Sequence, residues 1–191
     1  MIKYYKEVNV KKYLFIFLLL AAILTRMGAQ EKTAQAAELT FSFTRLSGFS
    51  SNQFAVWVED SQGKFIKTLY ATKFTAAGGW KRRETSIPIW VKKSGLADLK
   101  GAQVDAITGA TPKTGALKYT WDGKDSSGKA VPAGNYVLFL EGTLRQENQV
   151  LCRAPISLGN EAKPAEVSVE YKGDAGADRA MIVDVKVRTL R

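Results

Sequence analysis

Apolar and polar residues alternate along most of the chain beyond residue 38, with the two-residue period of strands that bury one face. Turn residues at 60–63 separate two of these runs, 54–59 and 65–70, so we expect them to pair as an antiparallel hairpin. Near the end of the chain, alternation over 167–171 and 183–187 predicts a closing hairpin. The remaining strand-like runs are 39–46, 117–121, 136–141 and 150–158.

One segment has a different period. Ile87, Trp90 and Val91 are spaced for one face of a helix, which predicts a short helix over about 86–94. Seven to nine strands with little helix and regular turns favour an antiparallel sandwich. The predicted fold class is therefore all-β, a single antiparallel β-sandwich over 39–191 with at most one short helix.

The N-terminus has the layout of a secretory signal peptide, because lysines precede the apolar run 13–24 and small and polar residues follow it. That run has 12 residues, short of the roughly 20 that a membrane-spanning helix needs. We expect 1–30 to be a signal peptide and 31–38 a flexible segment, with cleavage after Gln30 or Ala36. The expected location is periplasmic or otherwise extracytoplasmic, with no stable membrane span after cleavage.

Charge and composition exclude several classes of function. The formal net charge of +10 falls to about +6 without the first 30 residues, and Lys81-Arg82-Arg83 is the only basic run of three beyond them, so a nucleic-acid partner is not expected. The chain has no histidine, which excludes Ser-His-Asp and Cys-His catalysis. Cys152, the single cysteine, lies in a strand-like run and is predicted to be buried and inert.

A glycine-rich and aspartate-rich hairpin loop follows the run at 117–121. Trp121-Asp122-Gly123-Lys124-Asp125-Ser126-Ser127-Gly128, followed by Gly134-Asn135-Tyr136, resembles the Ig-like domain of flagellar hook-capping proteins, as does Gly63-Lys64-Phe65-Ile66-Lys67-Thr68-Leu69. The resemblance covers roughly 52–142 and implies an Ig-like sandwich. Hook-capping proteins have no cleaved signal peptide, which argues against a flagellar role here. The acids of this loop have the wrong spacing for a calcium site, so a plain turn is expected.

The whole exported arrangement resembles a bacterial periplasmic family of undefined function, over about 39–159. The residues that carry this resemblance are the strand with Trp57, together with Trp80, Trp90, the Thr-Gly-Ala-Thr loop at 108–111 and the Trp-Asp-Gly hairpin.

The most informative short motif is Asp105-Ala106-Ile107-Thr108-Gly109-Ala110-Thr111. It resembles the Asp-x-x-Ser/Thr-Gly-Ala-Thr/Ser acceptor motif of flavinylated electron-transfer subunits. That resemblance implies that a separate flavin transferase places flavin mononucleotide (FMN) on Thr111 through a phosphoester. The candidate cofactor-binding residues are Thr111, Asp105, Thr108, Gly109 and Ala110.

Simple chemistry suits these roles. A Gly-Ala pair keeps bulk away from a bound flavin phosphate, and Asp105 could orient the loop or help to place a metal in the transferase complex. The chain departs from the subunits' usual continuation, because Pro112-Lys113-Thr114 follows the acceptor and the surrounding domain is a different fold. Pro112 favours an extended Thr111, which either exposes the hydroxyl or disturbs recognition. Lys113 and the basic run at 81–83 could offset the flavin phosphate charge.

Two hypotheses of function follow. In the first, the protein is not itself an enzyme but a periplasmic accessory that carries covalent FMN and exchanges electrons with a membrane oxidoreductase. In the alternative, it is a cofactor-free Ig-like binding or structural module for an envelope protein or glycan, and 108–115 is a plain loop or a docking surface for a flavin protein.

Two other readings of the side chains carry less weight. The four tryptophans could stack sugars, but Trp57, Trp90 and Trp121 lie in apolar-periodic runs and are expected in the core, which leaves Trp80 nearest a surface site. An enzyme that uses the carboxylates Glu59, Asp60 and Asp122 has no spacing signal to support it.

Overall fold

The computed structural model describes residues 35–48 and 50–191, so the predicted signal peptide lies outside the described residues. The described residues form one compact unit. Its strands are β1 (Ala36–Phe43), β2 (Gln53–Asp60), β3 (Phe65–Thr72), β4 (Thr108–Gly109), β5 (Gly115–Trp121), β6 (Gly134–Arg145), β7 (Asn148–Leu158), β8 (Pro164–Ala165), β9 (Ser168–Lys172) and β10 (Ile182–Leu190). The short helices are α2 (Lys73–Ala76), α3 (Pro88–Lys93) and α4 (Ala102–Ala106), with 3-10 turns η1 (Gly79–Lys81), η2 (Leu96–Asp98) and η3 (Gly176–Met181).

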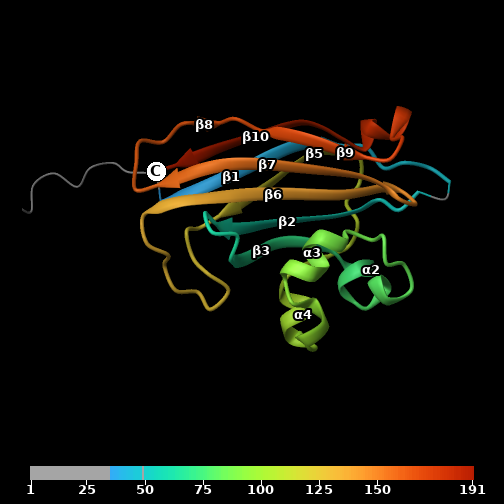
Figure 1. Ribbon diagram of the computed structural model, residues 1–191, viewed down its shortest axis with the longest axis horizontal. Helices are drawn as coiled ribbons and strands as arrows, with labels where there is room; N and C mark the ends of the chain where they lie inside the picture. The colour runs from blue at the N-terminus through green and yellow to red at the C-terminus, as the bar shows by residue number, and fades with distance from the viewer. Residues whose placement is uncertain (1–34, 49) are drawn as a thin grey trace, which may run out of the picture. The chain divides into compact units, whose positions relative to one another are not determined.

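The strands form two sheets that pack face to face (Figure 1). The four-stranded sheet has the order β5-β1-β10-β8, and the six-stranded sheet has the order β4-β3-β2-β6-β7-β9. Neighbouring strands are antiparallel except β3 and β4, which are parallel. The prediction of an all-β sandwich is therefore confirmed, and so is the hairpin of β2 and β3.

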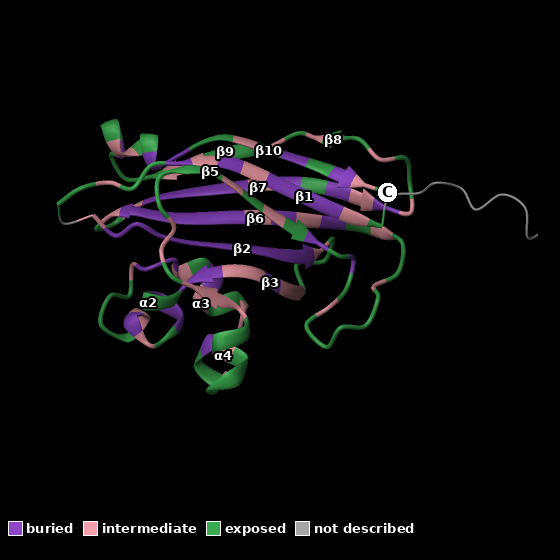
Figure 2. Ribbon diagram, turned by 180° about the vertical axis from the view of Figure 1, so that it is seen from behind, coloured by how far each residue is buried: buried purple, intermediate pink, exposed green. Residues whose placement is uncertain are grey.

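The sheets enclose the larger of two hydrophobic cores, here called the inter-sheet core (Figure 2). Alternation along β1 turns Leu39, Phe41 and Phe43 inward, and all three are buried. Phe54 of β2 meets them from the other sheet, with its ring 5.5 Å from that of Phe41 in an edge-to-face arrangement. This geometry is favourable for aromatic pairs.

The segment 73–107 between β3 and β4 forms a helical cap on the outer face of the six-stranded sheet (Figure 1). The sequence predicts one helix over 86–94, which is present as α3, whereas the cap holds three short helices. The other two contain four and five residues, too few to show a helical period. A second core, the cap core, lies beneath them and includes Trp57, Trp90 and Leu96.

The cap explains the burial of β2, whose residues 53–59 are all buried although a one-sided strand would bury only alternate positions. Its attachment is also polar. Glu141 of β6 accepts hydrogen bonds from the backbone N–H groups of Ile89 and Trp90, at 3.1 and 2.7 Å. Thr143 accepts another from the N–H of Ile87, which has a φ of 43° that a β-branched residue rarely adopts.

The predicted closing hairpin is wrong. β9 pairs with β7 in the six-stranded sheet, whereas β10 pairs with β1 and β8 in the other sheet, and η3 lies between β9 and β10 in the chain. Alternation indicates which residues share a face but not which strand is the neighbour. At the N-terminal end, β1 begins at Ala36, three residues before the boundary expected at 39.

Candidate functional site

The seven motif residues are distributed over three elements. Asp105 is exposed on α4, Thr108 and Gly109 form β4, and Ala110 and Thr111 begin a connection to β5. We call residues 110–114 of this connection the acceptor loop. β4 pairs with the last two residues of β3, so the loop starts from a fixed position at the edge of the six-stranded sheet and crosses to the other sheet.

Tyr70 of β3 holds the start of the acceptor loop. Its hydroxyl donates a hydrogen bond of 2.7 Å to the carbonyl oxygen of Ala110. A Cβ atom placed on Gly109 would lie only 2.7 Å from the Tyr70 ring, so the ring can cross the backbone there only because the residue is glycine. Burial raises the pKa of Tyr70 to about 12, which keeps the hydroxyl protonated and able to donate at neutral pH.

Tyr70 is a residue that the sequence does not reveal. It is separated from Ala110 by 40 positions, and no local pattern links the two. Its ring also stacks on Phe54, at 5.1 Å, and packs beside Tyr119 of β5, at 5.0 Å. The loop is thus fastened to an aromatic group that continues into the inter-sheet core.

Thr111, the candidate acceptor, differs from its neighbours in its hydrogen bonds. Thr111 is half-buried, and no residue in the described part of the chain forms a hydrogen bond with its hydroxyl. Thr114, three residues further along, differs because its hydroxyl oxygen accepts a hydrogen bond of 2.9 Å from the backbone N–H of Arg45. The loop is therefore anchored on both sides of Thr111, while the Thr111 hydroxyl has no hydrogen-bond partner among the described residues.

A hollow of about 340 Å³ lies within the helical cap and includes Asp105, Trp80 and Lys81 in its wall. The structure thus brings Asp105 together with part of the basic run, but Thr111 does not line this hollow. Trp80 is half-buried, as expected of the tryptophan nearest a surface site. The other three tryptophans have no exposed surface, which confirms that they belong to the cores and removes the idea of a four-tryptophan sugar platform.

The three carboxylates considered for an enzyme, Glu59, Asp60 and Asp122, do not form one cluster. Glu59 accepts from the Trp57 indole N–H at 2.8 Å and pairs with Lys93 at 2.8 Å. Asp60 caps its own turn, and Asp122 pairs with Lys67 at 3.0 Å. Within 35–48 and 50–191, no three His, Cys, Asp or Glu side chains are grouped so as to hold a metal ion.

The aspartate-rich loop after β5 is a hydrogen-bonded turn. The Asp125 carboxylate accepts from the Ser127 hydroxyl and from the backbone N–H groups of Ser127 and Lys129. The Ser127 hydroxyl and the Lys129 amide lower the pKa of Asp125. These bonds agree with the prediction of a plain turn rather than a calcium loop.

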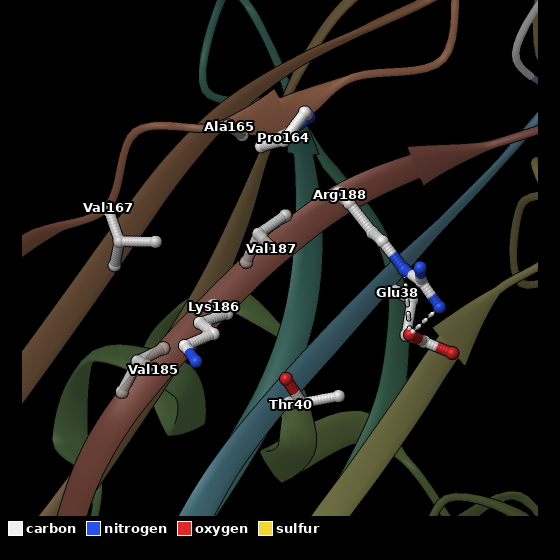
Figure 3. A pocket seen from close by; sticks show the side chains of 9 residues that line it. All are labelled: Glu38, Thr40, Pro164, Ala165, Val167, Val185, Lys186, Val187 and Arg188. Carbon is white, nitrogen blue, oxygen red and sulfur yellow. Dashed lines mark hydrogen bonds and ion pairs between the residues drawn. The ribbon is translucent and has the colours of Figure 1, made fainter.

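A larger hollow, about 590 Å³, lies elsewhere, beside β10 where β8 pairs with only two of its residues (Figure 3). Three charged residues line it, Glu38, Lys186 and Arg188, and Glu38 pairs with Arg188 at 2.8 Å and with Lys118 at 3.7 Å. None of the candidate cofactor-binding residues lines it. The thiol of Cys152 is buried in the inter-sheet core, and burial raises its pKa to about 12, as expected of an inert cysteine.

With this geometry in place, comparison with known families becomes informative. A family model described as a predicted periplasmic protein (DUF2271) matches residues 36–177, which include β1 to β9, the helical cap and the acceptor loop. The chain belongs to this family. It is a periplasmic protein, as the export signal predicts, and the resemblance to a periplasmic family of undefined function is confirmed.

The DUF2271 description assigns no reaction, cofactor or partner. Searches of curated proteins and of solved structures find no match. No helix in the described part of this DUF2271 chain is long and apolar enough to cross a membrane. The similarity to hook-capping domains and the flavin acceptor motif remain predictions.

Proposed function

We propose that this periplasmic protein carries FMN on Thr111 and serves as an accessory in electron transfer, exchanging electrons with a membrane oxidoreductase. The observation that carries the proposal is the contrast within the acceptor loop. Tyr70 and Arg45 hold the residues on either side of Thr111, whereas the Thr111 hydroxyl has no partner among the described residues. A modification enzyme would meet a threonine of fixed position with an available oxygen.

The residues present fit attachment rather than self-catalysed transfer. Joining FMN to a hydroxyl with loss of water is unfavourable in water, so the donor must be activated, and a flavin dinucleotide meets this need. The Thr111 oxygen would attack the phosphorus on the riboflavin side of the donor, the bond to the AMP oxygen would break, and the hydroxyl proton would pass to a base. No carboxylate or histidine of the acceptor loop can serve as that base, so the transferase supplies it.

Three of the four other candidate residues, all but Thr108, then have a task that their positions allow. Gly109 admits the Tyr70 ring, Ala110 offers its carbonyl to Tyr70, and exposed Asp105 is open to the transferase from α4. Lys113 is exposed two residues beyond the acceptor and offsets phosphate charge, an idea that unchanged loading of Lys113→Glu would remove. Bound flavin would supply one-electron and two-electron chemistry.

The test is the intact mass and visible absorbance of the protein co-produced with a flavin transferase. We expect a mass gain of one FMN unit and a yellow colour in the parent and in Thr111→Ser, and neither in Thr111→Ala. Thr120→Ala is the matched control, because it removes an exposed hydroxyl of β5 that does not hold the acceptor loop, and it should load normally. No gain in the parent, with a transferase active on a known acceptor, would overturn the proposal.

A second candidate, the cofactor-free binding module, rests on the hollow of the helical cap. Trp80 is half-buried there, with Lys81 in the same wall, and together they offer a flat aromatic face and a cation to an envelope ligand. A colourless protein isolated from a host that flavinylates other proteins would favour this candidate.

A further inference from the structure

Positive charge is concentrated in the helical cap. Its 35 residues, 73–107, hold seven basic and three acidic side chains, a net charge of +4. The rest of the described chain holds 15 basic and 13 acidic side chains, a net charge of +2 over a much longer stretch. The cap therefore dominates the field of the protein on one side of the six-stranded sheet (Figure 1).

An exposed aromatic ring lies within this charge. Phe74 of α2 is 39% exposed, one of only four large hydrophobic side chains that are exposed in the described part of the chain. The guanidinium groups of Arg82 and Arg83 lie 5.8 and 5.4 Å from the centre of its ring. We call these three residues the Phe74 cluster.

Phe74 packs closely against the start of η1. A Cβ atom on Gly79 would clash with the Phe74 carbonyl oxygen and lie 2.7 Å from the Phe74 ring, so glycine is needed for this close approach. The next residue, Trp80, is half-buried and carries the ammonium group of Lys81 5.5 Å from its ring. The stretch 74–83 of the cap thus presents two partly exposed aromatic rings and three exposed cations, and we call this stretch the cap surface.

The cations of this surface have no anionic partners within the described fold. None of Lys81, Arg82 and Arg83 is among the six ion pairs that the described residues form. Arg83 makes one long hydrogen bond, 3.3 Å to the Ser51 hydroxyl. Lys93 of the same cap shows the contrast, since Glu59 neutralises it. The charge of the Phe74 cluster and Lys81 is therefore available to an outside anion.

We propose that this surface of the cap docks the protein on an anionic phospholipid membrane. Cations bind the headgroup phosphates, and Phe74 and Trp80 enter the interfacial region that aromatic side chains favour. The cations lie on long, exposed side chains that can adjust to mobile headgroups, and this suits a fluid lipid layer better than a fixed array of acidic groups on a protein. Two partly exposed rings give shallow, reversible binding.

Vesicle flotation tests the proposal with protein isolated from the periplasm. We expect binding to equal mixtures of phosphatidylcholine and phosphatidylglycerol at low salt, loss of binding at high salt, and little binding to phosphatidylcholine alone. Each cation near such a surface contributes about fivefold to the binding constant, so Arg82→Gln with Arg83→Gln should weaken binding about thirtyfold. Phe74→Ala should weaken it several-fold without any change in charge.

The matched control is Lys124→Gln with Lys129→Gln in the hairpin loop between β5 and β6, which removes the same charge from exposed side chains outside the cap. A variant counts only if its thermal midpoint of unfolding equals that of the parent, so that weaker binding does not reflect a loss of the fold. The proposal fails if the control weakens binding as much as the arginine pair does. It also fails if the parent ignores the anionic vesicles, and a pull-down that then recovers an acidic protein would assign the surface to that partner. Flavin loading does not enter this test.

Discussion

The core between the two sheets and the core beneath the helical cap are built from different side chains. In the inter-sheet core, apolar side chains such as Phe41, Phe54 and Leu138 meet across the sandwich. In the cap core, both buried tryptophans donate hydrogen bonds to polar side chains of the six-stranded sheet. The indole N–H of Trp90 donates to the Thr68 hydroxyl at 3.0 Å, and that of Trp57 donates to Glu59.

This difference sets how each layer is held. Burial of apolar area is non-directional, so no single contact fixes how the two sheets pack on each other. Buried hydrogen bonds depend on direction and are costly to lose. The cap is therefore held on the sheet in one position, and a few contacts determine that position. The buried polar residues of the outer face and its edges are Gln53, Glu59, Thr68, Thr72, Glu141, Thr143 and Gln149.

Removing one large side chain from each core is the strongest test of this contrast. Phe54→Ala should lower the free energy of unfolding by about 3–5 kcal/mol, because it leaves a cavity in the inter-sheet core. Trp90→Ala should instead release the cap first, because the cap can separate from an intact sandwich. Hydrogen exchange would then accelerate mainly within 73–107, and uniform acceleration over both sheets would contradict the contrast.

A change of pH should loosen the cap without any mutation. Burial raises the pKa of Glu141 to about 7 from its ordinary 4.5, against the two N–H groups of α3 that favour the ionised form. The folded protein therefore binds this proton more tightly than the unfolded chain, and stability is lost as pH rises from about 4.5 through 7. The shift corresponds to about 3 kcal/mol.

Chemical denaturation across this pH range measures the effect. Glu141→Gln cannot ionise, so its free energy of unfolding should stay level where that of the parent declines. The free energy of unfolding of Glu141→Gln should also be lower than that of the parent at acidic pH. The side chain of glutamine has one oxygen in place of two, so one of the two N–H groups of α3 loses its acceptor. Parallel profiles for the two proteins would show that another group causes the decline.

The same contrast explains what could be predicted from the sequence. β1 was predictable because Leu39, Phe41 and Phe43 alternate with residues on the other face. The cap was mostly missed because its helices are short and its aromatic residues face a sheet that is already buried on its other side. The partner of β9 was missed because Val169, expected to face inward, is 47% exposed, and alternation does not name neighbours.

The candidate site also contains residues that the sequence reveals and residues that only the fold reveals. Asp105 and Thr108 to Thr111 stand out because they lie within seven consecutive residues, and such a motif is visible in the sequence without knowledge of the fold. Tyr70 does not stand out, because its contact with Ala110 exists only after β3 and β4 have paired. Phe74, Arg82 and Arg83 come together through the turn at Gly79, so their pairing also depends on the fold.

A smaller effect is expected where the acceptor loop meets the sandwich. Gly109 has no positive φ, so alanine fits its backbone, but the added Cβ would lie 2.7 Å from the Tyr70 ring. Gly109→Ala should therefore cost about 1–3 kcal/mol by overpacking. In a Tyr70→Leu background the same change should cost little, and an equal cost in both backgrounds would mean that Tyr70 is not the obstacle.

The smallest effect isolates one hydrogen bond. Tyr70→Phe keeps the ring but removes the 2.7 Å bond to the Ala110 carbonyl, which should cost about 1 kcal/mol and make 110–114 more open to proteolysis. Tyr119→Phe is the control, because within 35–48 and 50–191 no residue forms a hydrogen bond with the Tyr119 hydroxyl. If Thr111 is the flavin acceptor, a transferase should show a higher KM for Tyr70→Phe than for Tyr119→Phe, because a looser loop is presented less often in the form that binds. Equal KM values with full loading would leave Thr111 as the acceptor and show that Tyr70 serves only the stability of the sandwich edge.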